Sequence, residues 1–166
     1  MPEQPSIPVP QGEGLVVAET GRGRFQMEAK TASAAFLVDE PIPDGGLGSG
    51  PGPYDLLSAA LGACTAMTVR LYAERKGWPL DRVQVSVLHH RATLDSRDLF
   101  NRTIKLQGAL DDDQRDKLMQ IAQRCPVHLT LERGADVRTT LSAAEPAPPA
   151  PAISEHMRDM EEACAG

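Results

Sequence analysis

The chain has 166 residues, which is enough for one domain with a single core, and only 4% of them are aromatic, so the core should be aliphatic. The net charge of −6 argues against a nucleic-acid-binding surface. We expect no apolar run of membrane-spanning length and no basic leader with an apolar segment, which favours a soluble cytoplasmic protein without a membrane partner. Three cysteines cannot all pair within one chain, so redox or catalytic use is more plausible than structural disulfides.

The N-terminal third of the domain is predicted to be a β-meander. Residues 1–13 are rich in proline, show no periodicity, and are expected to be disordered. Strands are predicted at 15–19, 24–30 and 35–38, joined by turns that contain glycine or serine. The loop that follows, 39–52, holds five glycines and three prolines. Long aperiodic loops of this kind often have a function.

A long central helix is predicted to begin at Pro53 and to end at Gly77. Proline fits the first helical position, and Asp55 lies in the first turn, where the helix dipole favours a carboxylate. Two basic residues precede the terminal glycine, which suits the position after a helix. The segment 58–66 consists almost entirely of small residues, so we expect it to be deeply buried, with Cys64 at its centre.

The second half of the domain should alternate strands with a helix. Strands are expected at 83–92, 103–107 and 135–141. Asp111 is predicted to cap a helix, with Gln114 completing a capping box, and Pro126 should end that helix. Residues 127–131 form either a short extra turn or the start of a strand. This order of elements predicts an α+β fold built on antiparallel sheets.

The chain closes with a linker and a short tail. Residues 143–153 are rich in proline and alanine and are predicted to be a solvated linker. The tail, 154–166, could form a marginal amphipathic helix with Met157 and Met160 on one side. We expect Cys164 to be an exposed thiol without a role.

Two cysteines are the main candidates for chemistry. Cys64 is either a small buried hydrophobe or a reactive thiol. In the middle of a helix it has no assistance from an N-terminal dipole, so a thiolate there would need a cation from elsewhere. Cys125, beside Pro126 at a helix end, could be a resolving thiol that folding brings close to Cys64.

Two arginines and one carboxylate could support such a thiol. Arg22 and Arg24 lie in or beside the first hairpin turn, where they are either solvated or placed so that one guanidinium lowers the pKa of the thiolate. Asp55 either caps its helix or holds that arginine in a charge-assisted hydrogen bond.

A metal site is the weaker alternative. Cys125 and His128 have a Cys-x-x-His spacing, but a zinc site needs three or four ligands. His89 and His90 are adjacent on a predicted strand, so they face opposite sides and cannot both enter one site. We therefore expect no metal and no other cofactor, and a metal-dependent hydrolase is the least favoured hypothesis.

The sequence around both cysteines resembles one family. The segment 52–68, with Ala-Cys at the centre of a small-residue helix, and the later Arg-Cys-Pro-Val-His at 124–128 are similar to the OsmC/Ohr family, which comprises osmotically induced protein C and the organic hydroperoxide resistance proteins. The resemblance covers about 15–141, within a predicted domain of 14–142. The residues that make up these motifs resemble the OsmC-like branch more than the hydroperoxide resistance proteins proper.

The resemblance implies a fold and a chemistry. The fold would be OsmC-like, an intertwined homodimer in which both protomers line each site and the long helices meet at the centre. Cys64 would be the peroxidatic thiolate that becomes a sulfenic acid, and Cys125 would condense with it to a disulfide. Arg22 is the better match to the family's arginine, with Arg24 second. The implied reductant is a dihydrolipoyl-type dithiol.

One position departs from the family. In the hydroperoxide resistance proteins a glutamate follows the proline that opens the helix, whereas here that position is Tyr54 and the acid, Asp55, comes one residue later. The first hypothesis is a cysteine-based peroxidase that reduces organic hydroperoxides in an antioxidant stress response. The alternative is a non-catalytic or ligand-binding relative that keeps the fold and the cysteines.

Overall fold

The structure, a computed structural model, describes residues 14–143 and 154–166 and divides into two compact units. Of the described residues, the first unit contains 14–52 and 140–143, and the second contains 53–139 and 154–166. The predicted disordered segment 1–13 and residues 144–153 of the predicted linker lie outside the described residues.

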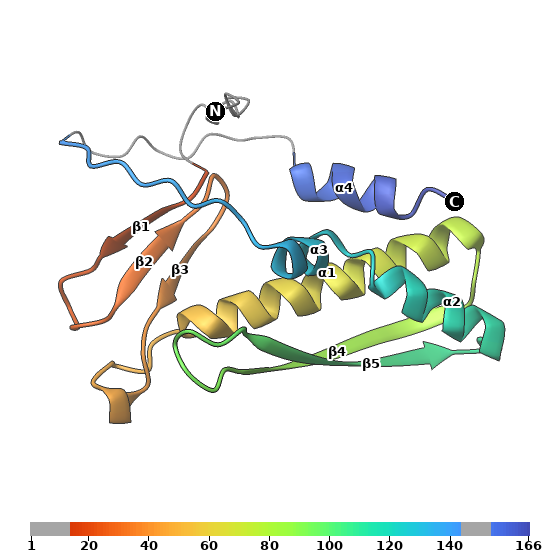
Figure 1. Cartoon of the computed structure of the whole chain (residues 1–166), viewed down its shortest axis with the longest axis horizontal. Coiled ribbons are helices and arrows are strands. Elements are labelled where there is room, and N and C mark those ends of the chain that lie inside the picture. Colours follow the sequence, from red (N-terminus) through yellow and green to blue (C-terminus); the bar gives the residue numbers. More distant parts are fainter. Residues whose placement is uncertain (1–13, 144–153) are drawn as a thin grey trace. The chain divides into compact units, whose positions relative to one another are not determined.

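The first unit holds a three-stranded antiparallel sheet in the order β1-β2-β3 (Figure 1). Its elements are β1 (Val16–Glu19), β2 (Met27–Lys30), β3 (Ala35–Val38) and a short 3-10 helix, η1 (Ile42–Asp44). The predicted meander is therefore correct, although β2 begins three residues later than expected. The cause is Gln26, whose side-chain and backbone oxygens both bond to Thr20 and close the turn ahead of the strand.

The glycine-rich loop after β3 is held by one buried carboxylate. Asp39 accepts hydrogen bonds from the backbone N–H of Leu47 at 3.0 Å, from that of Ser49 at 3.2 Å and from the Ser49 hydroxyl at 2.7 Å. These bonds, the one from the Ser49 hydroxyl first among them, hold the pKa of Asp39 below its usual value. At Gly50 the backbone runs so close to β3 that a Cβ would lie 2.1 Å from the carbonyl oxygen of Leu37. The loop is thus packed and hydrogen-bonded.

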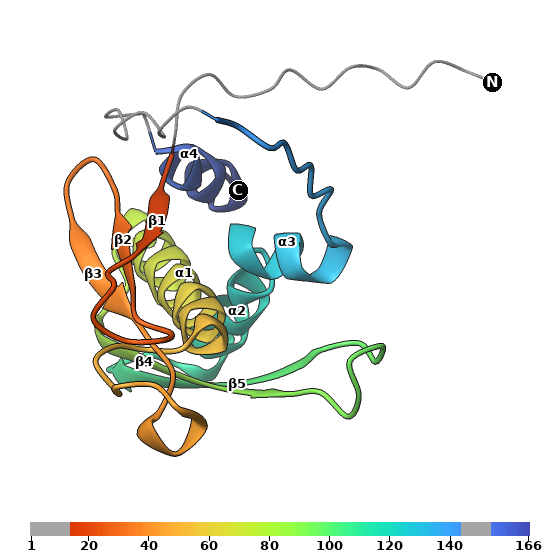
Figure 2. The ribbon, with the colours of Figure 1, turned by 90° about the vertical axis from the view of Figure 1, so that its left-hand side faces the viewer.

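The second unit is built around one long helix. Its elements are α1 (Pro53–Lys76), β4 (Leu80–His90), β5 (Leu99–Gly108), α2 (Asp112–Ala122), α3 (Pro126–Arg133) and α4 (Glu155–Ala163). The strands β4 and β5 form an antiparallel pair, and α1 packs along β4 and against α2 and α3. Figures 1 and 2 show α1 between this sheet on one side and α4 on the other.

Local sequence signals fix most of these boundaries. The helix α1 begins at Pro53 and ends just before Gly77, as predicted. Asp111 caps α2, and the capping box with Gln114 is complete. The main core lies between the two helices, where Val69 and Tyr72 of α1 pack in the same cluster as leucine and isoleucine side chains of α2.

The small-residue segment of α1 is buried on one side only. Leu61 and Cys64 are buried, whereas Ala59, Ala60 and Ala63 are exposed. The expectation that all of 58–66 is deeply buried is therefore wrong for this chain. The residues on the exposed side leave a surface of small side chains on α1.

The helix α1 also changes an expectation about membranes. By length and composition it is long and apolar enough to cross a membrane, so the expectation that the chain has no such run is wrong. The core helix of a soluble protein meets the same two criteria. Because α1 packs along β4 and against α2, we describe it as a core helix.

Of the two alternatives for residues 127–131, the short extra turn agrees with the structure and the strand is wrong. These residues belong to the helix α3, because Pro126 occupies its first position and its fixed φ suits a helix start. The predicted strand 135–141 is not a strand, and Val137 and Leu141 are 88% and 98% exposed. Within the described residues no strand pairs with it, and alternation alone cannot make a strand without a neighbour.

The tail forms the helix α4 and packs against α1 and α3. Met160 and Cys164 are 2% and 4% exposed, so the prediction of an exposed Cys164 thiol is wrong. The Tyr72 hydroxyl of α1 donates a hydrogen bond to the carbonyl oxygen of Gly166 at 3.3 Å. A helix of nine residues is marginal alone, so this docking is what stabilises it.

Candidate functional site

The structure brings the two candidate cysteines together. The Sγ atoms of Cys64 and Cys125 lie 2.8 Å apart, and both residues are free thiols with 2% and 0% of their surface exposed. Cys64 lies on the face of α1 that meets α3, and Cys125 is the N-cap residue of α3. Apolar side chains surround the pair, namely Leu61, Val87, Phe100, Val127 and Leu131.

The N-terminus of α3 points at the thiols. The backbone N–H of Val127 donates to the Sγ of Cys64 at 3.4 Å. A helix N-terminus stabilises negative charge, so Cys64 receives from α3 the dipole assistance that its own helix cannot give. The sequence signal for this arrangement is Pro126, which can occupy the first position of a new helix as well as end the previous one.

An arginine from β5 reaches the same pair through a threonine. Arg102 donates from Nη1 to the Oγ1 of Thr65 at 2.7 Å, and Thr65 Oγ1 lies 3.7 Å from the Sγ of Cys125. Arg102 also donates from Nη2 to Gln123 at 3.3 Å. The sequence analysis missed Arg102. Its position on the strand was the available signal. Arg102 lies two residues before Ile104, so both side chains point to the inward face of β5, and Arg102 is the charged residue on that face.

The pair binds protons unequally. The hydrogen bond with Cys125 and burial together raise the pKa of Cys64 far above its ordinary value. The hydrogen bond with Cys64 lowers the pKa of Cys125 to about 6, against the opposing effect of burial. The backbone N–H of His128, the side chain of Thr65 and the charge of Arg102 lower it further. The hydrogen bond between the two thiols therefore favours the loss of one proton from the pair and disfavours the loss of a second.

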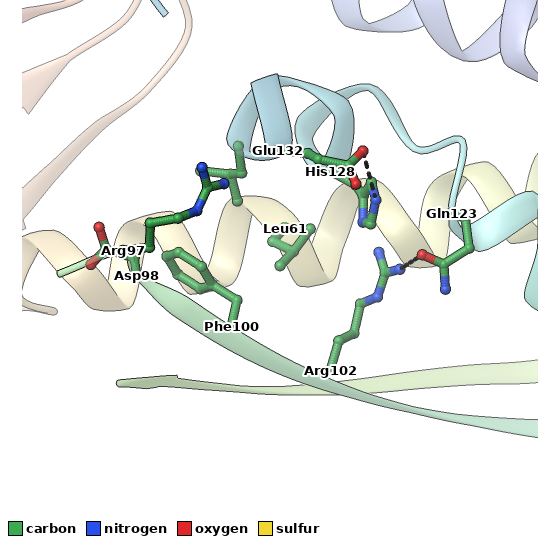
Figure 3. A pocket seen from close by; sticks show the side chains of 9 residues that line it. Leu61, Arg97, Asp98, Phe100, Arg102, Gln123, His128 and Glu132 are labelled. Atoms are coloured by element: carbon green, nitrogen blue, oxygen red, sulfur yellow. Dashed lines mark hydrogen bonds and ion pairs between the residues drawn. The ribbon is translucent and has the colours of Figure 1, made fainter. Parts of the chain in front are cut away.

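A pocket of about 330 Å³ lies beside the pair, between β5 and α3. It is lined by Leu61, Arg97, Asp98, Phe100, Arg102, Gln123, His128, Leu131 and Glu132. Figure 3 shows Arg102 reaching toward Gln123 on one side, and Arg97 and Phe100 on the other. Leu61 packs in one cluster with Cys64 and Cys125, and Arg102 donates a hydrogen bond to Thr65. Both residues also line the pocket, so the pocket borders the thiol pair directly.

Tyr54 belongs to a stack of rings next to this pocket. Its ring lies parallel to that of His89, with centroids 4.4 Å apart, and His89 in turn contacts Phe100. The Nε2 of His89 bonds to Asp98 at 2.7 Å, and this bond lowers the pKa of Asp98. His89 is thus turned toward α1, whereas His90 is exposed on the opposite face of β4, as the alternation predicted.

The remaining predicted residues lie elsewhere. Arg22 and Arg24 are exposed in the first unit, so their approach to the thiols stays a prediction. Asp55 is exposed in the first turn of α1, nine residues before Cys64, which is about 14 Å along the helix axis. Within residues 14–143 and 154–166, no three potential metal ligands form a cluster.

The family of the chain follows from comparison with known proteins. Residues 46–140, more than half of the chain, match the family model for OsmC-like proteins. The chain therefore belongs to the OsmC/Ohr family, which confirms the resemblance seen in the sequence. No curated protein matches the chain.

Solved structures of the same fold agree with this assignment. A protein of Psychrobacter arcticus described as an osmotic stress induced and detoxification response protein is 20% identical with a TM-score of 0.65, covering 75% of this chain and 91% of its own. An organic hydroperoxide resistance protein OsmC of Legionella pneumophila is 19% identical with a TM-score of 0.54, covering 70% and 86%. An organic hydroperoxide resistance protein of Elizabethkingia anophelis is 18% identical with a TM-score of 0.54, covering 70% and 86%. The α+β OsmC fold is thus confirmed.

Proposed function

We propose that this protein is a cysteine-based peroxidase that reduces organic hydroperoxides, with Cys64 and Cys125 as its redox-active pair. The observation that carries the proposal is the 2.8 Å separation of two buried free thiols beside a pocket. Membership of a family that includes organic hydroperoxide resistance proteins supports it.

The reaction has two chemical steps. Cys64 attacks the distal oxygen of the hydroperoxide, so that a sulfur–oxygen bond forms, the oxygen–oxygen bond breaks, and an alcohol leaves. Cys125 then attacks the sulfur of the Cys64 sulfenic acid, forming the disulfide and releasing hydroxide, which solvent protonates to water. The separation of 2.8 Å means that closing the disulfide requires the sulfurs to approach by less than 1 Å.

A dithiol must return the enzyme to its starting state. We propose a dihydrolipoyl-type dithiol, whose thiolate attacks the Cys64–Cys125 disulfide and whose second thiol resolves the mixed disulfide. Arg22, or else Arg24, would orient the peroxide oxygen, and Asp55 would hold that arginine. The separation of the two sulfurs supports the roles of the cysteines in this scheme.

The proposed enzyme is a cytoplasmic homodimer. Ala60 and Ala63 are exposed on α1, and Met67 on the same side of the helix is 52% exposed. A surface of small apolar side chains on a core helix fits close contact with the same helix of a second copy. The large exposed fraction of Met67 supports this proposal. Burying this apolar side chain against a second copy would remove it from water and so stabilise the dimer.

The function is tested by following hydroperoxide consumption with dihydrolipoamide as reductant. We expect Cys64→Ser to abolish consumption, because no thiol remains to attack the peroxide. Cys125→Ser should consume at most one equivalent and leave a sulfenic acid on Cys64 that a dimedone-type reagent traps. Cys164→Ser is the matched control for a buried cysteine outside the pair and should keep wild-type activity.

Mass spectrometry gives the independent readout. One equivalent of cumene hydroperoxide should convert the reduced wild-type protein to a form with a Cys64–Cys125 disulfide. Equal consumption of hydroperoxide by the wild type and by Cys64→Ser would contradict the proposal, whatever disulfides form.

A ligand-binding relative is the second candidate, and Tyr54 is the observation that favours it. Where the hydroperoxide resistance proteins have a glutamate, this chain places a ring that stacks on His89 and lines a second hollow of about 360 Å³ with Arg97 and Phe100. The discriminating measurement is the amount of hydroperoxide that the reduced protein consumes. A protein that binds an aromatic ligand and consumes no hydroperoxide would favour this candidate over the peroxidase.

A further inference from the structure

Arg102 is a cation without a counter-ion in the wall of the pocket. It projects from the inward face of β5, is half-buried, and donates one hydrogen bond to Thr65 and one to Gln123, both of which are neutral. Among the described residues, no carboxylate oxygen lies within 4.0 Å of its guanidinium. A half-buried guanidinium has lost part of its hydration, so an anionic ligand would restore the interactions that it lacks.

This cation lies close to the two sulfurs. The Nη1 of Arg102 is 2.7 Å from the Oγ1 of Thr65, which lies 3.7 Å from the Sγ of Cys125, and that sulfur is 2.8 Å from the Sγ of Cys64. These contacts join end to end. One compact molecule can therefore touch the guanidinium with one group while another group lies at Cys64.

The same pocket has an apolar lining. Leu61, Phe100 and Leu131 line it, and all three also belong to the cluster around the thiol pair. A ligand in this pocket would bury an apolar body against these side chains. The pocket thus fits a molecule with an apolar body and a single negative group.

The other charged side chains of the pocket do not take the place of Arg102. The two carboxylates, Asp98 and Glu132, each lie against a histidine, at 2.7 Å and 3.6 Å. Arg97 is exposed, and Figure 3 shows it at the opposite end of the pocket from Arg102. At the end of the pocket that adjoins the thiols, Arg102 is therefore the cation that an anionic ligand would meet.

We propose that Arg102 is a specificity-determining residue whose guanidinium binds the carboxylate of a compact organic hydroperoxide. The apolar body of this substrate lies against Phe100 and its neighbours while the peroxide group reaches Cys64. A guanidinium suits a carboxylate because it can donate two parallel hydrogen bonds to it. The inference rests on the proposed peroxidase function and names the substrate class of the same site.

The carboxylate takes no part in bond making. Cys64 gives two electrons to the peroxide, so that the sulfur–oxygen bond forms as the oxygen–oxygen bond breaks. The proton that Cys64 gives up passes through solvent to the leaving alkoxide. The products are the Cys64 sulfenic acid and an alcohol that still carries its carboxylate, which dissociates from Arg102.

The test compares cumene hydroperoxide with its para-carboxylate derivative, which differs only in the added anionic group. The second-order rate constant for consumption by the reduced wild type should be about tenfold higher for the carboxylated substrate, because it gains charge-assisted hydrogen bonds. Arg102→Gln should abolish this preference. Arg102→Lys, which keeps the charge but not the planar fork, should retain part of it.

Two further variants make the test specific. Lys105→Gln removes a charge from the exposed face of the same strand and should keep the preference. Arg97→Gln removes the other arginine of the pocket and should keep it as well. Loss of the preference in Arg97→Gln but not in Arg102→Gln would assign the carboxylate to Arg97 and overturn the inference.

A binding measurement separates this inference from the proposed function. In calorimetry, para-isopropylbenzoate, which has no peroxide group, should bind to the reduced wild type about tenfold more tightly than the neutral para-isopropylbenzamide. Arg102→Gln should remove that difference. Arg102-dependent binding in a protein that consumes neither hydroperoxide would reject the peroxidase and support the carboxylate site.

The opposite result is equally clear. Equal rate constants for the two hydroperoxides in an active wild type overturn the inference and leave the peroxidase intact. If Arg102→Gln does not fold, as judged by circular dichroism, the wild-type preference and its partial loss in Arg102→Lys decide the question.

Discussion

At the scale of single residues, Gly50 and Gly62 differ in whether the structure leaves room for a side chain. A Cβ at Gly50 would lie 2.1 Å from the carbonyl oxygen of Leu37, which no real side chain tolerates. A Cβ at Gly62, in the middle of α1, would meet the side chain of Val87 at 3.5 Å, an ordinary van der Waals distance. Gly50 is therefore required by the loop, whereas Gly62 costs the helix conformational entropy without a matching steric need.

These distances predict opposite effects for the same substitution. Gly62→Ala should raise the free energy of unfolding by about 0.5–1 kcal/mol, because alanine restricts the unfolded chain and fills space against β4. Gly50→Ala should lower it by about 1–3 kcal/mol, because the backbone must move to admit the methyl group. Urea unfolding of both variants measures the two values. A destabilised Gly62→Ala would show that α1 and β4 are closer than their contact at Val87 indicates.

The residues of the candidate site could be predicted only in part. Cys64 and Cys125 could be proposed because each has a distinctive neighbourhood in the sequence, a run of small residues and a proline. Arg102 could not, because its role depends on Thr65 and Gln123, which lie on other elements and meet it only in the folded chain. Cys164 was expected to be exposed because a short tail gives no sign in sequence of the surface against which it packs.

At the scale of elements, α4 shows how a marginal helix becomes part of the core. Its exposed and buried methionines are three residues apart, Met157 being 45% exposed and Met160 2%. Arg75 of α1 donates a hydrogen bond to the carbonyl oxygen of Glu161 at 3.1 Å and fixes the helix further. Docking through one buried side and a few polar contacts should make α4 the least stable helix of its unit.

This arrangement predicts unequal effects of removing the two methionines. Met160→Ala should lower the free energy of opening α4 by about 2 kcal/mol, because it leaves a cavity beneath this helix, and amide exchange in α4 should become roughly 30-fold faster. Met157→Ala, the matched control, should change exchange by less than about threefold. Equal effects of the two substitutions would mean that α4 is not docked through Met160.

Helices were predicted more accurately than strands for a physical reason. Both ends of α1 and the start of α2 are determined by proline, glycine and the capping box, all within a few residues of each boundary. The end of α2 was predicted less well, because the helix stops at Ala122 and not at Pro126. The segment 135–141 has the alternation of a strand, but a strand forms only when another strand pairs with it, and that partner is not encoded locally. The fold class could thus be predicted, and the pairing of the last segment could not.

At the scale of the whole molecule, the exposed side of α1 bears on assembly. Ala60, Ala63 and Met67 form an exposed apolar surface on a helix whose opposite side carries buried residues such as Leu61 and Cys64. A symmetric contact of two copies along this surface would place each residue near its own counterpart. A single charge there would meet its like charge and lose its hydration.

Ala63→Glu should therefore convert a dimer into a monomer, whereas wild type should sediment as a dimer at micromolar concentration. Gln120→Glu, on the exposed side of α2, adds the same charge and should leave the dimer intact. Sedimentation velocity distinguishes the two species. Wild-type protein that sediments as a monomer, or an Ala63→Glu variant that remains a dimer, would contradict the proposed homodimer.

The short distance between the two sulfurs would limit irreversible oxidation of the sulfenic acid in a peroxidase of the proposed kind. A sulfenic acid has two fates, capture by a thiol or irreversible oxidation by a second peroxide molecule, and their ratio depends on how quickly each partner arrives. Here the rescuing sulfur lies 2.8 Å away inside an apolar enclosure, whereas a second peroxide must diffuse in from solvent. Such kinetic partitioning would let the protein withstand bursts of oxidant that inactivate enzymes with a distant second cysteine.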